Sequence, residues 1–395
     1  MVVVHFSITP LAGAPYLLVS ALQRHTSITA RLIDLKRWDR FRHDIVFEEH
    51  PEEAYELAKK ANVIHLHNYL DYESRDFWPI DFRELHGRGV TFVRHFHSVP
   101  AAVARKMRKD EEAVVKDCIP SVVIGQYPEV YYPNARVVPN LLPICTDLYM
   151  PGSHDLNDVD VIFTPSNNAS AWDKRWGTKG APETAKMLTR LREFCGASVS
   201  VVSGEPHDHV LSRKRRARVV IDELITGSYH LSGLEGCSQG KPVLSFLSSR
   251  TEMVMKELAG TRSVPFVNVR LEEAFEVLVH LVRDKALAQE IGGNAREWME
   301  RYWAEQYLIH HFVQLYYDLL SSPHKVMRQE ELRIEGDTAR FFSVVLPDLM
   351  YRARMKHYKS DITLIERGFL KIKKLFGLIK RVSKKLISGF LSTIG

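Results

Sequence analysis

The chain has 395 residues, of which 45% are hydrophobic and 26% are charged, as in ordinary globular proteins. This length exceeds what one compact core usually holds, so we expect two domains with an appendage. No run of about 18 apolar residues occurs, and the start MVVVHFSITPLAG lacks a basic segment and a cleavage site, so neither a membrane-spanning helix nor a signal peptide is expected. We therefore expect a cytoplasmic protein.

The net charge of +6 comes from the C-terminal tail. Residues 367–395 contain eight lysines and arginines and no acidic residue. The preceding residues contain 46 lysines and arginines and 48 acidic residues. This distribution argues against a nucleic-acid partner. Within the tail, Ile372, Phe376 and Ile379 share one face of a predicted helix and basic residues cover the other. The tail could pack on the protein, have little order, or bind an anionic membrane surface, which would place the protein peripherally on the inner face of the membrane. Nucleic-acid binding by the tail is the remaining option, but aromatic residues are sparse there and no known motif occurs.

Apolar runs alternate with helical patterns in the first 150 residues, which is typical of parallel strand–helix units. The pattern predicts helices at Ala14–Arg24, Pro51–Lys60 and Val103–Val115. A segment rich in Pro, Gly, Asn and Asp at residues 140–160 is interpreted as a linker. The predicted strands are Val2–Ile8, Ala30–Leu35, Val63–His67, Thr91–His95, Ser121–Ile124 and Arg136–Val138.

A second alternating series follows the linker. Its predicted helices are Ala181–Phe194, Leu231–Gln239 and Glu252–Ala259, and the chain is mostly helical after Leu271. Its predicted strands are Val159–Thr164, Ser198–Val202, Val219–Ile221 and Val243–Phe246. We thus expect an α/β protein with two doubly wound, Rossmann-like domains that face a central cleft. The expected divisions are residues 1–150, residues 151–320 and a helical extension at residues 321–395.

The segment TGSYHLSGLEGCSQGKPVLSF (residues 226–246) combines a glycine turn, a predicted helix and a Gly-Lys-Pro-Val turn. A helix that begins after such a turn presents free N–H groups and a partial positive charge, which suit phosphate. Glu235 lies within the helix, where its carboxylate could accept hydrogen bonds from a sugar diol. A plain strand–turn–helix–strand unit without a ligand is the alternative, and the residues alone do not decide between them.

This segment resembles the nucleotide-binding motif of GT-B glycosyltransferases, specifically the retaining family 4. That motif has two glutamates separated by seven residues, followed by Gly-Lys-Pro-Val. The resemblance implies that Glu235 contacts the nucleotide ribose, and that backbone near Ser228, Tyr229, His230 and Leu231 binds the donor diphosphate. Gly227 stands where the family has its first glutamate, which faces the donor sugar. Asp222 or Glu223 could substitute for that carboxylate.

A second match is VDVIFTPSNNASAWDKRWGTKGAPETAKMLTRL (residues 159–191), which resembles the first strand and helix of the same family's C-terminal domain. Lys179 then matches the family lysine that meets the donor diphosphate, where its charge stabilises the leaving phosphate. The companion arginine of the family has no counterpart, because Ser166 and Asn167 occupy that stretch. Lys174 or Arg175 could take its role.

The N-terminal half carries looser matches. His97, after the strand in TFVRHFHSVP, matches a histidine that borders the sugar cleft in this family, and it is expected to face the reacting sugar. His65 and His67 end a neighbouring strand, and a site role and a structural role remain equally open for both. Gly13 lies in a loop that resembles the family's phosphate-approaching glycine loop.

The resemblance, over residues 1–320, implies transfer of a sugar from a nucleotide diphosphate donor, such as a UDP- or GDP-sugar, to a glycan or lipid-linked acceptor, with retention. A catalytically inactive GT-B-like binding or scaffolding protein is the alternative, favoured by Gly227 and the missing arginine. A GT-B sugar-nucleotide epimerase fits the motifs less well. The four cysteines lack metal-ligand spacing and no H-E-x-x-H occurs, so we expect no metal and no cofactor.

Overall fold

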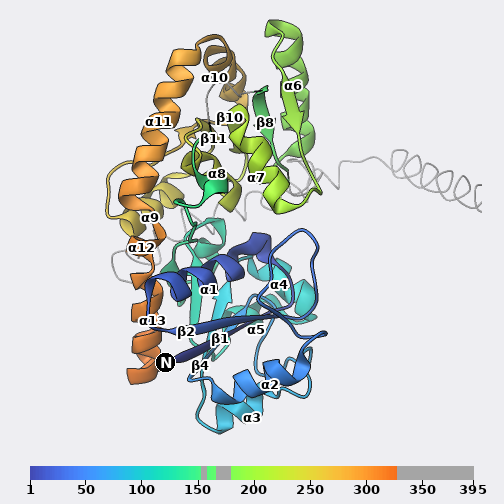
Figure 1. Cartoon of the computed structure of the whole chain (residues 1–395), viewed down its shortest axis with the longest axis vertical. Helices are drawn as coiled ribbons and strands as arrows, with labels where there is room; N and C mark the ends of the chain where they lie inside the picture. The colour runs from blue at the N-terminus through green and yellow to red at the C-terminus, as the bar shows by residue number, and fades with distance from the viewer. Residues whose placement is uncertain (153–157, 166–178, 327–395) are drawn as a thin grey trace, which may run out of the picture. The chain divides into compact units, whose positions relative to one another are not determined.

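The computed structural model describes residues 1–152, 158–165 and 179–326. In this part of the chain the strands form two parallel sheets (Figure 1). The seven-stranded sheet has the order β3-β2-β1-β4-β5-β6-β7 and the five-stranded sheet has the order β12-β11-β10-β8-β9. Both orders are those of doubly wound α/β folds, as the alternating sequence pattern predicts.

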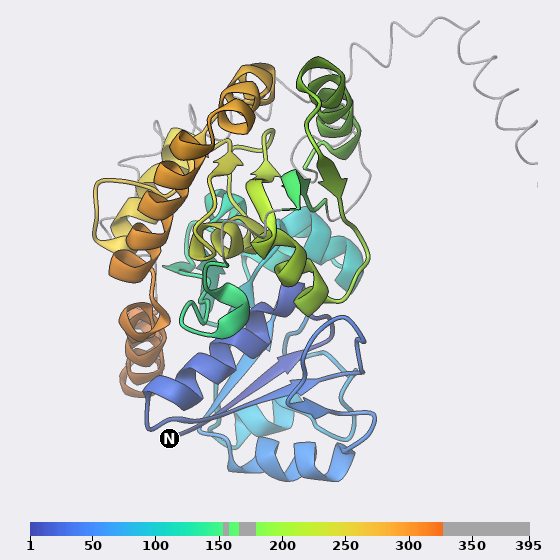
Figure 2. The ribbon, with the colours of Figure 1, turned by 45° about the horizontal axis from the view of Figure 1, so that its top comes forward.

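The first sheet contains strands that are buried on both faces, which is why they read as nearly continuous apolar runs. Its strands are β1 (Val2–Ser7), β2 (Thr29–Asp34), β3 (Ile45–Val46), β4 (Val63–His67), β5 (Thr91–Phe96), β6 (Ser121–Ile124) and β7 (Arg136–Val138). The helices along this half are α1 (Ala14–His25), α2 (Pro51–Lys60), α3 (Phe82–Gly87), α4 (Pro100–Met107) and α5 (Glu111–Val115). Figure 2 shows α1 running along one face of this sheet, where it packs on β2.

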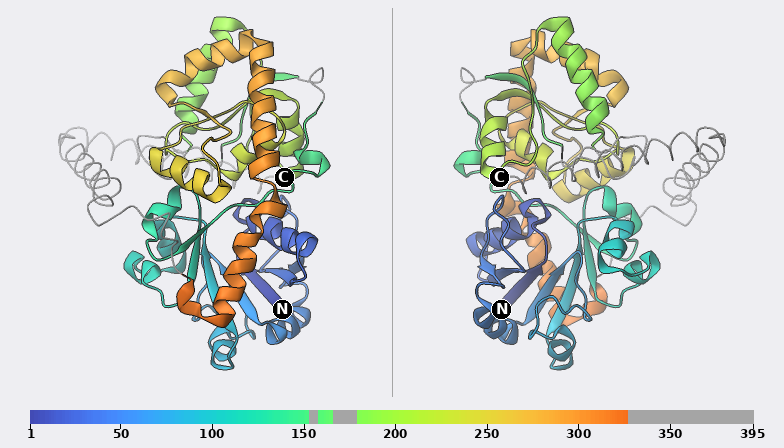
Figure 3. Two further views of the ribbon diagram at one scale, coloured as in Figure 1. Left: turned by 90° about the vertical axis from the view of Figure 1, so that its left-hand side faces the viewer. Right: turned by 90° about the vertical axis from the view of Figure 1, so that its right-hand side faces the viewer.

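The second sheet is built from β8 (Val159–Phe163), β9 (Val199–Val201), β10 (Ala217–Glu223), β11 (Val243–Ser245) and β12 (Val267–Asn268). Its helices are α6 (Ala181–Cys195), α7 (His207–Arg215), α8 (Leu231–Ser238), α9 (Ser249–Ala259), α10 (Leu271–Arg283) and α11 (Lys285–Tyr302). Two further helices follow, α12 (Glu305–Leu308) and α13 (His310–Ser321). Helix α13 returns to the first sheet and packs beside β5 (Figure 3).

Several elements differ from the sequence expectations. The helix predicted at Val103–Val115 is wrong, because Arg108 adopts a left-handed conformation (φ +56°) that separates α4 from α5. The edge strands β3 and β12 have two residues each, too few to give a period-2 pattern. Helix α7 was also missed, because its polar sequence HDHVLSRKR has no clear apolar stripe.

Gly240 confirms the predicted end of helix α8. It has a φ of +70° and directly follows the C-cap residue Gln239. Glycine reaches this left-handed conformation without the steric penalty of a Cβ. Gly292 of α11 packs against this turn so closely that a Cβ there would lie 2.1 Å from the Gly240 oxygen.

Among the described residues, no helix is long and apolar enough to cross a membrane. The basic tail after Arg367 and nearly all of the extension expected at residues 321–395 lie outside the described residues. The linker expected at residues 140–160 overlaps β8, which already begins at Val159. The domain boundaries at residues 150 and 320 stay predictions.

Candidate functional site

The order of the second sheet reverses beside β8, which has β9 on one side and β10 on the other. In open α/β sheets, ligands bind at such a switch point, outside the carboxyl ends of the strands. Here the carboxyl ends of β8 and β10 lie next to the starts of helices α6 and α8. Thr164, which follows β8, and Ser232 of α8 join their hydroxyls across this point at 2.8 Å.

A buried ion pair lies at this edge. Nζ of Lys179, just before α6, is 2.8 Å from Oδ1 of Asp222 in β10, and the two side chains are 5% and 0% exposed. The other Asp222 oxygen accepts the backbone N–H of His230, the N-cap of α8, at 2.6 Å. Burial alone would raise the pKa of Asp222, but the charges of Lys179 and His230 hold it below its usual value. Gly233 leaves room for the carboxylate, since a Cβ there would lie 2.6 Å from Asp222 Oδ2.

The next residue, Glu223, shapes the turn that leads into α8. Its carboxylate accepts the backbone N–H groups of Thr226 at 2.7 Å and Ser228 at 3.1 Å. Glu223 and Asp222 are both 0% exposed. Their contacts therefore lie within the protein, and the geometry does not support either as a replacement for the carboxylate that Gly227 lacks.

Gly227 has a structural reason to be glycine. Its φ is +81°, and a Cβ there would lie 3.1 Å from Cβ of Ser248 and 3.4 Å from Cε1 of Phe246. The Gly227 carbonyl accepts the Ser248 N–H and the Thr251 hydroxyl, so the backbone is held in this position. A glutamate does not fit this turn without strain.

Ser228 and Tyr229 connect the turn to the first sheet. The Tyr229 hydroxyl donates to the Gly125 carbonyl at 2.9 Å, and the backbone N–H of Tyr127 donates to Ser228 Oγ at 2.9 Å. Both side chains are about 1% exposed, and burial raises the pKa of Tyr229. Leu231 is also buried and begins α8. Because the N–H groups of Ser228 and His230 already donate to carboxylates, they differ from the free N–H groups expected from the sequence.

Glu235 lies on α8 and is paired on both oxygens. Its Oε2 is 2.5 Å from Nζ of Lys214, and its Oε1 is 2.7 Å from Nε2 of His207. Burial would raise the pKa of Glu235, but these two partners lower it to about 2. Through its Oε1, Glu235 also orients the His207 ring. The sequence analysis did not identify His207 as part of this site.

A pocket brings His207 together with Gly13. It is lined by the α1 start, by the loop after β2 and by residues near Asp147 and Asp208. Gly13 is the N-cap of α1, with a φ of +84°. The ring of Phe41 lies 5.7 Å from that of His207, and Arg42 forms a 2.9 Å ion pair with Asp208. Gly13 of the predicted glycine loop and His207, the partner of Glu235, thus line the same cavity.

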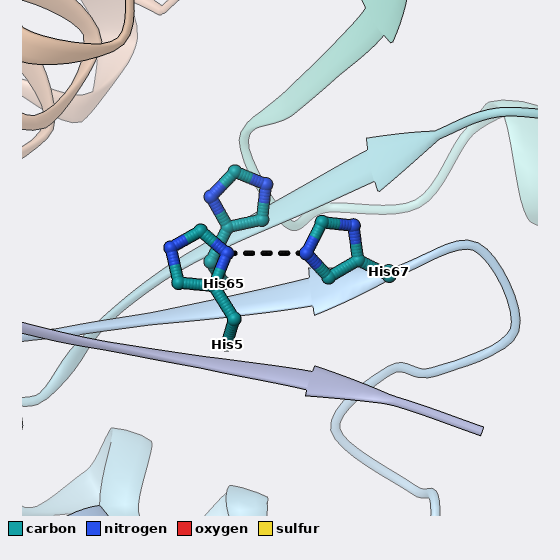
Figure 4. Close-up of side chains that lie close together, drawn as sticks. All are labelled: His5, His65 and His67. Atoms are coloured by element: carbon teal, nitrogen blue, oxygen red, sulfur yellow. Dashed lines mark hydrogen bonds between the residues drawn. The ribbon is translucent and has the colours of Figure 1, made fainter. Parts of the chain in front are cut away.

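His97 follows β5 at the edge of the first sheet. Its backbone N–H donates to Oδ1 of Asn68 at 2.8 Å, and its Nε2 is 3.1 Å from Nδ1 of His67. The residue is half-buried, and burial lowers the pKa of its imidazole to about 3. His65 and His67 are both buried in a row of histidines (Figure 4).

Three partners were missed in the sequence: His207 and Lys214 with Glu235, and Asp222 as the partner of Lys179. Lys214 stands in the basic run RKRRAR, where nothing marks one lysine as buried. The expected roles of Lys174 and Arg175, and the stretch with Ser166 and Asn167, lie outside the described residues. The roles assigned to His97, Lys179, Gly13 and Glu235 stay predictions.

No protein-family model and no curated protein matches the chain by sequence. Solved structures do match its fold. Sucrose-phosphate synthase from Thermosynechococcus elongatus is 14% identical, with a TM-score of 0.50 over 82% of this chain and 100% of that one. HepE from Anabaena, in complex with UDP and glucose, is 12% identical, with a TM-score of 0.53 over 80% of this chain and 98% of that chain.

An alpha-glucosyltransferase in complex with UDP and a 13-mer DNA containing an HMU base is 10% identical, with a TM-score of 0.54 over 80% of this chain and 99% of that chain. At these identities the likeness concerns the fold. The two parallel sheets, their doubly wound orders and these structural neighbours agree: the chain has the GT-B fold.

Proposed function

We propose that the protein is a glycosyltransferase that moves a sugar from a nucleotide diphosphate sugar to a glycan or lipid-linked acceptor, with retention. The observation that carries the proposal is Lys179, held by Asp222 at the switch point of the second sheet, beside the starts of α6 and α8. A UDP-sugar is the first donor to test, because HepE and the alpha-glucosyltransferase are in complex with UDP. A GDP-sugar is the second.

Lys179 supplies the charge that the reaction needs. Its ammonium has three N–H donors, and one of them is directed to Asp222. The remaining donors would bind the diphosphate and stabilise the negative charge that develops as the glycosidic bond breaks. Asp222 fixes the ammonium in place before the donor arrives, so that little reorganisation is needed in the transition state.

The other site residues surround the donor. Glu235 would accept a hydrogen bond from the ribose, since each carboxylate oxygen keeps a lone pair after pairing with Lys214 and His207. Gly13 would let the backbone approach the phosphates, and His97 would face the reacting sugar. The leaving phosphate can take the proton from the acceptor hydroxyl, so no second enzyme carboxylate is required.

A second candidate is a GT-B-like binding or scaffolding protein without transferase activity. The turn at Gly227 favours it, because Gly227 lacks the family carboxylate and the two neighbouring candidates among the described residues, Asp222 and Glu223, are both fully buried. Such a protein would bind a nucleotide but turn over no donor.

The test is a thermal-shift screen with UDP, GDP, ADP and CMP, followed by turnover assays with the matching nucleotide sugars. A ligand that binds the folded state raises its melting temperature by mass action. The double variant Lys179→Met/Asp222→Asn removes both charges without stranding one of them. We expect it to lose the nucleotide-induced shift, whereas Lys186→Ala, on the exposed side of α6, keeps it.

Glu235→Gln, with exposed Glu193→Gln as its control, tests the ribose contact in the same screen. A nucleotide shift without turnover of any donor would favour the binding protein. Absence of a shift with every nucleotide, together with absence of turnover, would contradict both candidates.

The membrane contact needs a separate experiment. We propose that the tail after Arg367 attaches the enzyme to anionic lipid, because its basic and apolar residues alternate with helical spacing. The full chain should co-sediment with anionic vesicles and the chain shortened before Arg367 should not. Equal binding by both forms would contradict a membrane role for the tail.

A further inference from the structure

Five histidines from three neighbouring strands gather on one face of the first sheet: His5 in β1, His65 and His67 in β4, His95 in β5, and His97 just after β5. Figure 4 shows three of them, from β1 and β4. The strand register pairs His5 with His65 and His67 with His95. Because alternate residues of a strand share a face, this register places their rings in one row.

Four of these histidines and a tyrosine form a continuous chain of hydrogen bonds. His97 Nε2 lies 3.1 Å from His67 Nδ1, and His67 Nε2 lies 3.1 Å from His5 Nδ1. His5 Nε2 lies 3.3 Å from the Tyr316 hydroxyl of α13, which is 2.9 Å from His65 Nδ1. The hydrogen-bond chain therefore runs from the half-buried His97 through Tyr316 of α13 to the buried His65.

Each imidazole in this chain is neutral. Burial lowers the pKa of His5 and His97 to about 3, and lowers the pKa of His65 and His67 well below the usual value. Burial also raises the pKa of the Tyr316 hydroxyl. A neutral imidazole has one N–H and one bare nitrogen, so every link has one donor and one acceptor. The Tyr316 hydroxyl could accept from both histidine neighbours only if its own buried O–H had no acceptor, since its side-chain hydrogen bonds to described residues are those to His5 and His65. All links then point the same way, either toward His97 or away from it.

The far end of the chain selects the direction. His65 Nε2 is buried and has no hydrogen-bond partner among the residues that the structure describes. If Tyr316 donated to His65 Nδ1, the proton of His65 would be on Nε2 as a buried, unpaired N–H. An unpaired donor is rarer in protein interiors than an unpaired acceptor. His65 Nδ1–H therefore donates to Tyr316, Tyr316 to His5, His5 to His67, and His67 to His97.

We propose that this chain holds His97 as the tautomer with its proton on Nδ1, so that His97 offers a neutral N–H donor to the donor sugar. The role of His97 toward the sugar rests on the proposed function, whereas its tautomer follows from the chain of hydrogen bonds alone. Nδ1 of His97 makes no hydrogen bond to a described residue and is thus available to a ligand. His67, His5 and Tyr316 are positioning residues, since they act through His97.

A metal ion is the competing explanation of the row. His5, His65 and His67, and likewise His67, His95 and His97, have ring nitrogens within 4.8 Å of one another. In the first group the rings are stacked at interplanar angles of 16° to 23°, so their lone pairs do not converge on one point. In the second group the rings are tilted by 33° to 40°, and His67 Nδ1 and His97 Nε2 face each other at the hydrogen-bond distance of 3.1 Å. The His5–His67 contact in Figure 4 is also a direct hydrogen bond.

The tautomer can be measured without any substrate. In protein labelled with ¹⁵N-histidine, long-range ¹H–¹⁵N spectra near neutral pH should show His97 with a protonated Nδ1 and a bare Nε2. Free neutral histidine in water prefers the opposite tautomer, so this result is not the default. A His97 protonated on Nε2 in the wild-type protein would overturn the proposal, and so would about one metal ion per chain in protein purified without chelator.

Tyr316→Phe breaks the chain while it preserves the ring. We expect the His97 nitrogen shifts to move toward the Nε2–H form, and turnover to fall on the order of tenfold with little change in KM, the worth of about one hydrogen bond. Tyr317→Phe, whose ring is 58% exposed, is the control and should change neither. Unchanged His97 shifts in Tyr316→Phe would contradict the proposal. The expected tautomer without turnover of any donor would contradict the proposed function alone.

Discussion

Lys179 and Asp222 form a nearly dry ion pair between two elements that are 43 residues apart in the sequence, with Nζ 2.8 Å from Oδ1. The pair links the residue before the start of α6 to the carboxyl end of β10. Because Asp222 also accepts the backbone N–H of His230, the N-cap of α8, one carboxylate contacts the residues before both helix starts at the switch point.

Removal of Lys179 alone should be strongly destabilising. Lys179→Ala leaves the Asp222 carboxylate buried without its counter-charge, and we expect a loss of about 3–5 kcal/mol in the free energy of unfolding. The double variant Lys179→Met/Asp222→Asn should recover most of this loss. Urea unfolding of both variants, with Lys186→Ala as the surface control, measures it. Equal stability of Lys179→Ala and wild type would contradict the buried pair.

The Glu235 pairs should make the fold sensitive to acid. The pKa of Glu235 falls from 4.5 to about 2 in the folded state, so its stabilising contribution is complete above pH 4.5 and is lost as the pH falls toward 2. This shift corresponds to about 3 kcal/mol. Unfolding free energies measured across this range should fall less steeply in Glu235→Gln than in wild type. Glu193→Gln, at an exposed position, should follow the wild-type curve.

The turn at Gly227 should reject a side chain for two separable reasons. Gly227→Ala introduces a Cβ at a left-handed residue, which costs about 1–2 kcal/mol, and also crowds Ser248. Gly196 has a φ of +68° and open space around it, so Gly196→Ala carries the conformational cost alone. We expect Gly227→Ala to lose more stability than Gly196→Ala in thermal unfolding. A smaller loss at Gly227 would show that the turn relaxes readily.

Tyr229 should stabilise the protein through one hydrogen bond to the first sheet. Tyr229→Phe removes the donor to Gly125 O and leaves a buried carbonyl unpaired, at a cost of about 1–3 kcal/mol. The measurement is the denaturant midpoint of unfolding. Tyr317→Phe is the control, and its midpoint should match that of wild type. If Tyr229→Phe also matches wild type, the Gly125 carbonyl has found another donor.

Much of the fold could be predicted from the sequence because parallel strands are short apolar runs between helical patterns. Val63–His67, Ser121–Ile124 and Arg136–Val138 have the bounds that the pattern predicts. Elements that lack such local signals, such as the two-residue β3 and the polar helix α7, were missed.

The candidate site was predicted only as single positions. Lys179, Glu235 and His97 carry chemical signals in their own motifs, but a sequence does not show which charges neutralise them. Asp222, Lys214 and His207 became partners only when separate strands and helices met at one sheet edge.

The sequence by itself determined the alternation of strands and helices and the glycine turn before helix α8, because each depends on neighbouring residues. Phosphate binding by residues 226–246 stays a prediction. The tertiary structure alone decided which carboxylates are buried, which amides they occupy, and how Tyr316 reaches His97 through two other histidines. The physical reason is that burial, pKa and hydrogen-bond direction depend on contacts between residues as far apart as β1 and α13. Such contacts exist only after the chain has folded.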